Sequence, residues 1–374
     1  AYETLLHACY FSQEVTSSVY AGIRGLNLAE RAGARPEMAR GYATMGFTAS
    51  MIPLHPLAES YGRRARTTAE SIEDPIARAW VEQMLGMYWM SICRWTAGAK
   101  SLGIALAINQ QAGNWRRWEE CLVELARLHY LRGQFAKGES EFARQFKRAD
   151  ELDHQQAKIW GRHGLATVIL RQGRVEESAA LLEESPAVRL GDETIRTADA
   201  IHGLGLLALA RLRLGKVEHA ERAAVSALDR IRSTRPMANF NLEGYAGTAE
   251  VFLELWEREG SSSRVVARQA RRANRALWTF AWLFPNALSR AWLCRGRAHW
   301  ISGKRSRARV AWRVALEFAQ QLGMPFEEAM VHHEIARRLG QADPSGASHL
   351  AQARALYTEL HATDDLDRLD RLTA

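Results

Sequence analysis

Several short patterns in the sequence are similar to parts of nucleotide-binding sites. Gly203, Gly205 and Ala208 spell a G-x-G-x-x-A string, which cradles a pyrophosphate when it joins a strand to a helix. Here the string lies inside a stretch of helical periodicity, so helix packing explains its small residues better. Lys216 and Lys304 follow glycines but lack the second glycine and the Ser or Thr of a phosphate-binding loop. We therefore expect no dinucleotide-binding site, no ATPase core and no cofactor in this chain.

The histidines and cysteines do not have the spacing of a metal site. His332, His333 and Glu334 match part of a zinc-protease helix, but Arg337 occupies the position of its second histidine. The cysteines form no Cys-x-x-Cys pair and no regular Cys/His spacing. They are Cys9, Cys93, Cys121 and Cys294. We expect no bound metal and a reduced, cytoplasmic environment.

The aspartate-rich end of the chain has no calcium-loop spacing, because neither a glycine turn nor a bidentate glutamate follows Asp364. Thr363 and Asp364 are expected to cap a last helix, with acidic residues favoured in its first turn. The sequence contains no Ser/His/Asp, Cys/His or paired-carboxylate arrangement that indicates catalysis. The pattern predicts a binding protein and no enzyme.

The charge is basic but unevenly distributed. The 374 residues carry a formal net charge of +8 with a pI near 9.5, and only six of the 50 basic residues are lysine. From Gly260 to Leu316 there is no Asp or Glu, while the basic residues contribute +13. We predict an anion-binding patch among these arginines, at Arg268, Arg271, Arg272, Arg275, Arg305 and Arg309.

Three interpretations of the basic stretch stay open at this point. Tryptophans interleaved with the arginines, namely Trp278, Trp282, Trp292, Trp300 and Trp312, would suit a nucleic-acid surface with stacking platforms. An acidic protein or a nucleotide is the second class of partner. In the third interpretation the tryptophans fill the core and the arginines are a solvated face. Nucleic acid is the least favoured of the specific partners.

Helical periodicity runs from end to end, with apolar residues at i, i+3, i+4 and i+7 and almost no β-branched alternation. Short breaks separate the helices and recur at fixed intervals. The breaks within hairpins fall at Pro53, Cys93, Gly133, Gly173, Gly215, Gly303 and Gly340, with a further one expected near Gly260. A period of about 40 residues indicates stacked helical hairpins. No run of 18 apolar residues exists, so no membrane-spanning helix is expected.

Small residues accompany each break. One lies seven positions before it, at Gly46, Gly86, Ala126, Ala166, Ala208 and Gly296. Another lies five positions after it, at Ala58, Gly98, Gly138, Ser178, Ala220 and Ala308. Because two helices approach closely only where their side chains are small, these positions predict tight antiparallel packing within each hairpin. We expect about eight or nine hairpins in one continuous solenoid domain over residues 1–374, with a weak subdivision near 258–264.

Segments such as ARLHYLRGQFAKGESEF and GRAHWISGKRSRARVAW resemble tetratricopeptide repeats in a longer, 40-residue bacterial form. Pro53 and Cys93 depart from this pattern, since glycine is usual at both. The stretches NLEGYAGTAEVFLELWE and LGMPFEEAMVHHEIARRL resemble the C-terminal repeat region of large bacterial STAND-type signalling ATPases, especially those linked to an adenylate/guanylate cyclase or a protein kinase. Related arms occur in transcriptional activators similar to the maltose-regulon regulator.

This resemblance implies an all-α, right-handed superhelical solenoid and a non-catalytic sensor arm in the bacterial cytoplasm, a fragment of a longer protein. It would bind a protein or peptide and contact an upstream nucleotide-binding domain. The alternatives are the effector-binding domain of a transcriptional activator and a free-standing adaptor. In such solenoids the first helix of each hairpin lines the concave face, which makes equivalent positions there candidate partner contacts. These are Arg40, Trp80, Arg127, Tyr130, Trp160, His163, His202, Arg290, Arg297 and Trp300.

Overall fold

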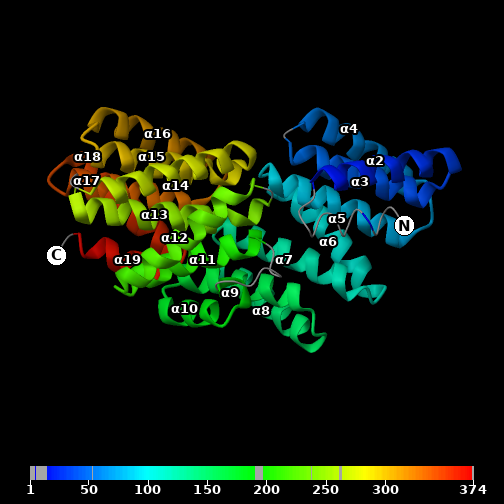
Figure 1. The fold of residues 1–374 in the computed structure, drawn as a ribbon, viewed down its shortest axis with the longest axis horizontal. Helices are drawn as coiled ribbons and strands as arrows, with labels where there is room; N and C mark the ends of the chain where they lie inside the picture. The colour runs from blue at the N-terminus through cyan, green and yellow to red at the C-terminus, as the bar shows by residue number, and fades with distance from the viewer. Residues whose placement is uncertain are drawn as a thin grey trace. The chain divides into compact units, whose positions relative to one another are not determined.

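The computed structural model describes Leu5 and residues 15–52, 54–189, 197–236, 238–260 and 263–372. Throughout these ranges the chain forms helices and no strand, which confirms the predicted all-α fold class (Figure 1). The α-helices are α2 (Val15–Ala32), α3 (Arg35–Ser50), α4 (His55–Glu70), α5 (Pro75–Ser91), α6 (Trp95–Gln111), α7 (Trp115–Leu131), α8 (Phe135–Glu151), α9 (Gln155–Arg171), α10 (Val175–Glu183), α11 (Thr197–Arg213), α12 (Val217–Ser233), α13 (Leu242–Glu259), α14 (Arg264–Leu283), α15 (Leu288–Ile301), α16 (Arg305–Gln321), α17 (Pro325–Leu339), α18 (Pro344–Glu359) and α19 (Thr363–Asp370). Short 3-10 turns lie at η1 (Pro186–Val188), η2 (Asn239–Asn241) and η4 (Pro285–Ala287).

The contacts divide the chain into two compact units, unit 1 (Ala1–Leu128) and unit 2 (His129–Ala374). The division falls within α7. The weak subdivision expected near 258–264 stays a prediction. That the whole chain acts as one continuous domain stays a prediction.

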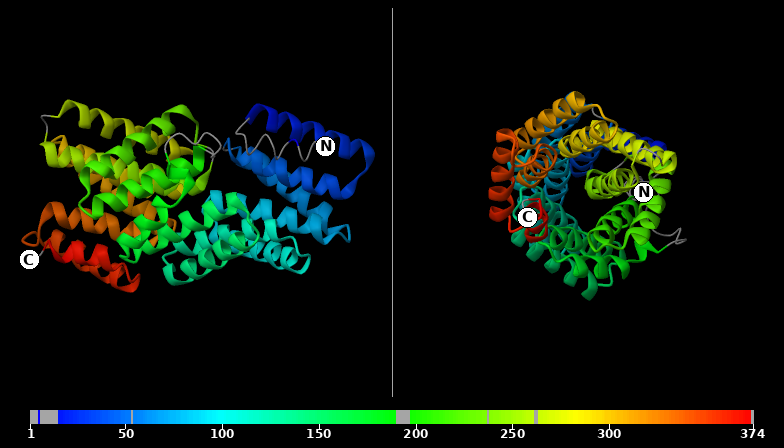
Figure 2. Two further views of the ribbon diagram at one scale, coloured as in Figure 1. Left: turned by 60° about the horizontal axis from the view of Figure 1, so that its bottom comes forward. Right: turned by 90° about the vertical axis from the view of Figure 1, so that its left-hand side faces the viewer.

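Within each unit, consecutive helices pack as antiparallel hairpins. In unit 1, α3 packs on α4 and α5 on α6, and in unit 2 the pairs include α11/α12, α15/α16 and α17/α18. The hairpins also stack on their neighbours, as α3 does on α5 and α11 on α13. An amphipathic helix pair buries its remaining apolar stripe only against the next pair, so this stacking follows from the repeat. The views in Figure 2 show the helices of unit 2 stacked in this way, from green to red.

Left-handed backbone ends the first helix of the hairpins at the predicted breaks. Gly133, Gly173 and Gly215 have φ values of 74°, 89° and 73°, and the breaks at residues 260, 303 and 340 have similar values. Cys93 adopts φ 61° without being glycine, so this hairpin tolerates the conformation that its side chain disfavours. The first predicted break, Pro53, lies outside the described residues.

The predicted small residues face each other across the hairpins. Ser178 Oγ donates a hydrogen bond of 2.7 Å to the Ala166 carbonyl oxygen, which joins the two small positions of one hairpin directly. A methyl group added to Gly46 would lie 3.1 Å from the Ala58 carbonyl oxygen. Ala208 is completely buried, as are most of the other alanines at the predicted small-residue positions. The packing predicted from the spacing is confirmed.

Replacing Ala208 with tryptophan is expected to lower the free energy of unfolding by about 1 to 3 kcal/mol, because the hairpin interior has no room for the ring. Urea denaturation of the variant measures the change. Val310→Trp is the matched control, since Val310 is 52% exposed on α16 and accepts the same ring without displacing neighbours. Equal stability of the two variants would contradict the placement of the small residues between the two helices of each hairpin.

Candidate functional site

A buried ionic network lies among the first helices of the unit 2 hairpins. Arg290 on α15 is fully buried, and its guanidinium donates to two acidic residues of neighbouring helices. Nε and Nη2 bond the two carboxylate oxygens of Glu327 on α17 at 2.8 and 2.5 Å, and Nη1 bonds Glu250 on α13 at 2.6 Å. Burial opposes the charge of Arg290, but the carboxylates outweigh it and raise the arginine pKa.

A second arginine extends the network to the start of unit 2. Arg171 on α9 is fully buried, forms an ion pair with Glu243 on α13, and has its guanidinium 4.6 Å from the centre of the Phe326 ring. The Tyr130 hydroxyl donates to the other oxygen of Glu243 at 2.6 Å. Burial alone would raise the pKa of Glu243, but Arg171 and Arg290 hold that pKa at about 2. The carboxylate is therefore ionised throughout the physiological pH range.

A third cluster continues along the same helices. Arg297 on α15 donates to Glu254 on α13 at 3.0 Å, and Arg338 on α17 pairs with Glu257 and Glu334. Burial would raise the pKa of Glu257, but the hydrogen bond and charge of Arg338 help to lower it to about 2. Alternating acids and arginines on α13, α15 and α17 thus join three consecutive hairpins.

The last helix is attached to helices much earlier in the same unit. Arg213 at the end of α11 binds Asp364 and Asp365 of α19 at 2.9 Å each, and its side chain is almost fully buried. The Thr363 hydroxyl donates to the Gln172 carbonyl oxygen at 2.7 Å. The prediction that Thr363 caps its own helix was wrong: the N-cap position is Ala362, and the hydroxyl binds the end of α9 instead. Figure 2 shows α19, in red, beside the green helices of unit 2.

A small charged pocket lies where these elements meet. It has a volume of about 220 Å³ between α11, α13, α15 and the α19 segment. Its lining residues are Leu209, Leu212, Arg213, Glu250, Glu254, Arg258, Arg297, Asp364, Arg368 and Arg371. The Nε groups of Arg213 and Arg297 are buried and make no hydrogen bond within the described residues. We call this cavity the concave pocket, because the first helices of the hairpins form most of its wall.

Of the predicted partner contacts in unit 2, Arg297 lines the concave pocket. Tyr130 and Arg290 belong to the buried network, and His163 contacts the Ser185 hydroxyl at 2.8 Å. His202 lies against His163 and 3.2 Å from the Thr167 hydroxyl. Contacts within the unit bury four of these side chains, so a ligand reaches them only if the helices move; they are Tyr130, His163, His202 and Arg290.

The other predicted contacts are placed as follows. Trp160 donates from Nε1 to Asp199 at 3.2 Å, and Trp300 has Arg305 over its ring at 3.7 Å. In unit 1, Trp80 donates to the Thr44 hydroxyl at 3.1 Å, Arg40 pairs with Glu37 and Arg127 pairs with Glu124. Their role as partner contacts stays a prediction.

The acidic half of the network was not among the sequence candidates. It consists of Glu243, Glu250, Glu254, Glu257, Glu327 and Glu334. These residues lie on α13 and α17, whose hairpins break at Gly260 and Gly340. A signal was present. The predicted contacts Arg290, Arg297 and Trp300 lie 13, 6 and 3 residues before the break at Gly303, and the same offsets counted from Gly260 and Gly340 reach four of these glutamates.

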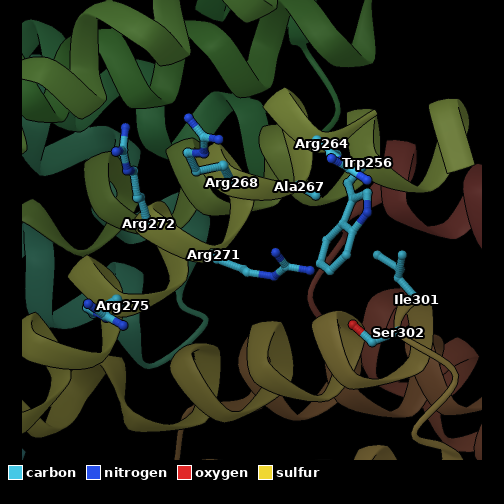
Figure 3. Close-up of a pocket in the computed structure, with 9 residues that line it drawn as sticks. All are labelled: Trp256, Arg264, Ala267, Arg268, Arg271, Arg272, Arg275, Ile301 and Ser302. Carbon is cyan, nitrogen blue, oxygen red and sulfur yellow. The ribbon is translucent and has the colours of Figure 1, made fainter. Parts of the chain in front are cut away.

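A second, larger pocket contains most of the predicted anion-binding patch. It has a volume of about 750 Å³ and lies between α13, α14 and α15 (Figure 3). Its lining residues are Trp256, Arg264, Ala267, Arg268, Arg271, Arg272, Arg275, Ile301 and Ser302. We call it the arginine pocket. The structure thus brings four of the six predicted residues together, adds Arg264, and places Arg305 and Arg309 apart from them on α16.

The tryptophans of the basic stretch are mostly covered. Trp312 is buried, and Trp300 packs against it. Trp278 and Trp292 meet edge to face, with Arg295 about 5 Å from both ring centres. Trp282 is the exception and is 71% exposed. The core interpretation of the tryptophans therefore fits the packing better than a row of stacking platforms.

The described residues contain no group of three or more potential metal ligands. His332 faces His349, with 2.6 Å between their Nδ1 atoms, and burial lowers the pKa of His332 to about 4. Cys93, Cys121 and Cys294 are buried free thiols whose pKa values burial raises, and Cys9 lies outside the described residues. No described helix is long and apolar enough to cross a membrane.

No protein-family model matches the sequence, and no curated protein matches it either. Among solved structures, the chain is similar to a Rap protein complexed with competence and sporulation factor, with a TM-score of 0.66, 10% identity and coverage of 98% of this chain and 97% of that one. NprR in complex with its cognate peptide NprX gives a TM-score of 0.60 at 10% identity, covering 95% and 96%. The Rap conjugation gene regulator of plasmid pLS20, in complex with the Phr* peptide, has a TM-score of 0.54 and 12% identity. The match covers 83% of this chain and 76% of that one. The fold is accordingly a tetratricopeptide-like α-solenoid.

Proposed function

We propose that this chain is a non-catalytic sensor that binds a peptide or a segment of a protein in the concave pocket of unit 2. The observation that carries the proposal is the pocket itself, which unites charged residues from three hairpins and the last helix. The likeness in fold to Rap and NprR, each solved with a peptide, supports it.

The chemistry of the concave pocket suits a peptide. Arg213 Nε is buried without a hydrogen-bond acceptor in the described residues, and Arg297 Nε lies 3.9 Å from Glu334 Oε1, beyond hydrogen-bond length. Burying such a donor unpaired is unfavourable, so a peptide carbonyl or carboxylate oxygen gains a strong partner there. Leu209 and Leu212 give the pocket an apolar side for a neighbouring side chain. The mixed wall matches a short peptide better than a purely apolar ligand.

Ligand binding in this pocket would act on an ion pair that holds two helices of unit 2 together. Its lining includes Arg213 and Asp364, whose ion pair attaches α19 to α11. A ligand oxygen that competes for Arg213 would weaken this attachment. Because the ligand would then bind more tightly when α19 is detached from α11 than when it is attached, it would shift the equilibrium toward the detached state. Movement of α19 is thus the proposed first response to binding.

The finer proposal places the chain in a bacterial STAND-type signalling ATPase, linked to a cyclase or kinase, with the signal passed to its nucleotide-binding module. The effector-binding domain of an activator similar to the maltose-regulon regulator, and a free-standing adaptor, are the alternatives. The reading frame upstream of residue 1 distinguishes them. An ATPase motif there supports the first, a helix-turn-helix the second, and an adjacent start codon the third.

Replacing Leu212 with tryptophan is expected to weaken peptide binding at least tenfold, which is about 1.4 kcal/mol. Leu212 is half-buried in the pocket wall, so the larger ring fills the cavity without removing any charge. Peptides selected from a random display library on the purified chain serve as probes, with their affinities measured by fluorescence anisotropy. Val310→Trp, on α16, is the control and should leave the affinity unchanged.

Two results would contradict the proposal. One is a library selection that yields no peptide binding above background. The other is a set of peptides that bind the Leu212 variant as tightly as the unaltered chain, which would place their site elsewhere.

A further inference from the structure

The arginine pocket has an uncompensated positive charge. Its five guanidinium groups, from Arg264 to Arg275, form no salt bridge with any described residue, whereas Arg290 and Arg297 of the same basic stretch are paired in the network. All five side chains are exposed. Like charges so close together repel one another, which costs stability unless an anion is bound. The pocket therefore has the electrostatics of a site whose counter-charge comes from another molecule.

The arginines form a line along one helix. Four of them, Arg264, Arg268, Arg272 and Arg275, recur at three- or four-residue intervals on α14, so they share one face. At ~1.5 Å per residue the line is about 16 Å long. An extended peptide of about five residues covers the same length at ~3.3 Å per residue. A linear polyanion can thus engage every arginine, while a compact one reaches two or three.

The walls of the pocket argue against nucleic acid. Trp256, the aromatic residue in the lining, is buried, and the Arg271 guanidinium lies 5.1 Å from its ring centre. Figure 3 shows the Arg271 side chain pointing to this ring. No base can stack on that ring without displacing Arg271. Single-stranded nucleic acids depend on such stacking, whereas carboxylates need the planar guanidinium fork that arginine supplies.

An apolar anchor lies beyond the arginines. Trp282 is on the last turn of α14, seven residues after Arg275, and is 71% exposed. Exposed tryptophans are frequent anchors of protein interfaces. An acidic stretch next to an apolar residue would match the order of charges and tryptophan along this helix.

We propose that the arginine pocket is a docking site for an acidic, extended segment of a partner protein. This site is separate from the concave pocket and lies at the joint between the α13/α14 and α15/α16 hairpins, formed by lining residues from both. It supplies the surface through which the chain engages a protein partner, and it does not depend on the peptide site proposed above.

The test measures binding of a labelled peptide of about eight glutamates, long enough to span the line of arginines. Fluorescence anisotropy is recorded with the full chain at about 50 mM salt, where screening is weak. The double variant Arg268→Glu/Arg272→Glu should weaken binding at least tenfold. Arg307→Glu/Arg313→Glu, which changes two exposed arginines of α16 and the net charge equally, should weaken it less than threefold.

Competing ligands identify the class of anion. A glutamine peptide of equal length should not bind, and inorganic tripolyphosphate and single-stranded oligothymidine should displace the glutamate peptide only in large excess. Displacement by either at equimolar concentration would overturn the proposal in favour of a phosphate ligand. Equal loss in both double variants, or no binding of the glutamate peptide, would also overturn it. Leu212→Trp should retain glutamate-peptide binding, so failure of one proposed site is distinguishable from failure of the other.

Discussion

Replacing Arg290 with methionine is expected to lower the free energy of unfolding by about 3 to 5 kcal/mol. The guanidinium is fully buried and is shared by Glu327 and Glu250, with Glu243 3.7 Å away. Methionine fills a similar volume but leaves buried carboxylates without their counter-charge, which is more costly than losing the hydrogen bonds alone. Urea denaturation followed by circular dichroism measures the change.

A matched control separates charge burial from loss of an arginine in general. Arg309→Met removes an exposed arginine from α16 and should change stability by less than about 0.5 kcal/mol. Adding Glu327→Gln to the Arg290 variant should restore part of the loss, because it removes one uncompensated charge. A loss below about 1 kcal/mol in the Arg290 variant would show that water reaches the network and screens it.

The fold could be predicted because its information is local and repeated. Gly133, Gly173 and Gly215 mark the breaks by a conformation that glycine adopts easily, and the spacing between them fixes the period. Ala166 and Ser178 then place the two helices of a hairpin face to face. These features either lie within one repeat or recur from one repeat to the next, so they can be predicted without knowing which distant helices meet.

Part of the ionic network could also be predicted from the spacing of residues relative to the breaks. Glu254 and Glu257 lie six and three residues before Gly260, and Glu327 and Glu334 lie 13 and six residues before Gly340, which are the spacings of the predicted concave positions in the other hairpins. Equivalent positions of adjacent hairpins lie side by side, which is why Arg290 meets Glu327 and Arg297 meets Glu254. The breaks of both hairpins were expected, but Leu253 and His333 occupy the positions where the other hairpins have a small residue, so the concave positions were not assigned there.

The contact between the last helix, α19, and α11 could not have been predicted from the repeat spacing. Arg213 and Asp365 are 152 residues apart, and their contact depends on the rotation that each intervening hairpin adds. Small errors in that rotation accumulate over several repeats, so the period does not reveal which helices meet again. The composition of the concave pocket, to which α19 contributes, is for this reason a result of the structure.

Replacing Gly205 with alanine is expected to lower the free energy of unfolding by about 3 kcal/mol, near the upper end of the range for overpacking. A methyl group there would overlap the Gly244 carbonyl oxygen, and one on Gly247 would overlap the Gly205 carbonyl oxygen. Helices α11 and α13 therefore touch through their backbones, where no side-chain rotation can relieve a clash. The G-x-G-x-x-A string is thus explained by helix packing, as expected.

The same substitution at Gly103 is expected to raise the free energy of unfolding instead of lowering it. Gly103 lies in the middle of α6, and a methyl group there would meet no atom within 4 Å. Alanine should raise stability by about 0.5 to 1 kcal/mol at that position, because it restricts the unfolded chain and favours the helix. Urea denaturation of both variants, with hydrogen exchange of the amides in α11 and α13, measures the two effects. A stabilising Gly205→Ala substitution would mean that these helices are further apart, and the concave pocket, whose wall includes both, would then be wider than described.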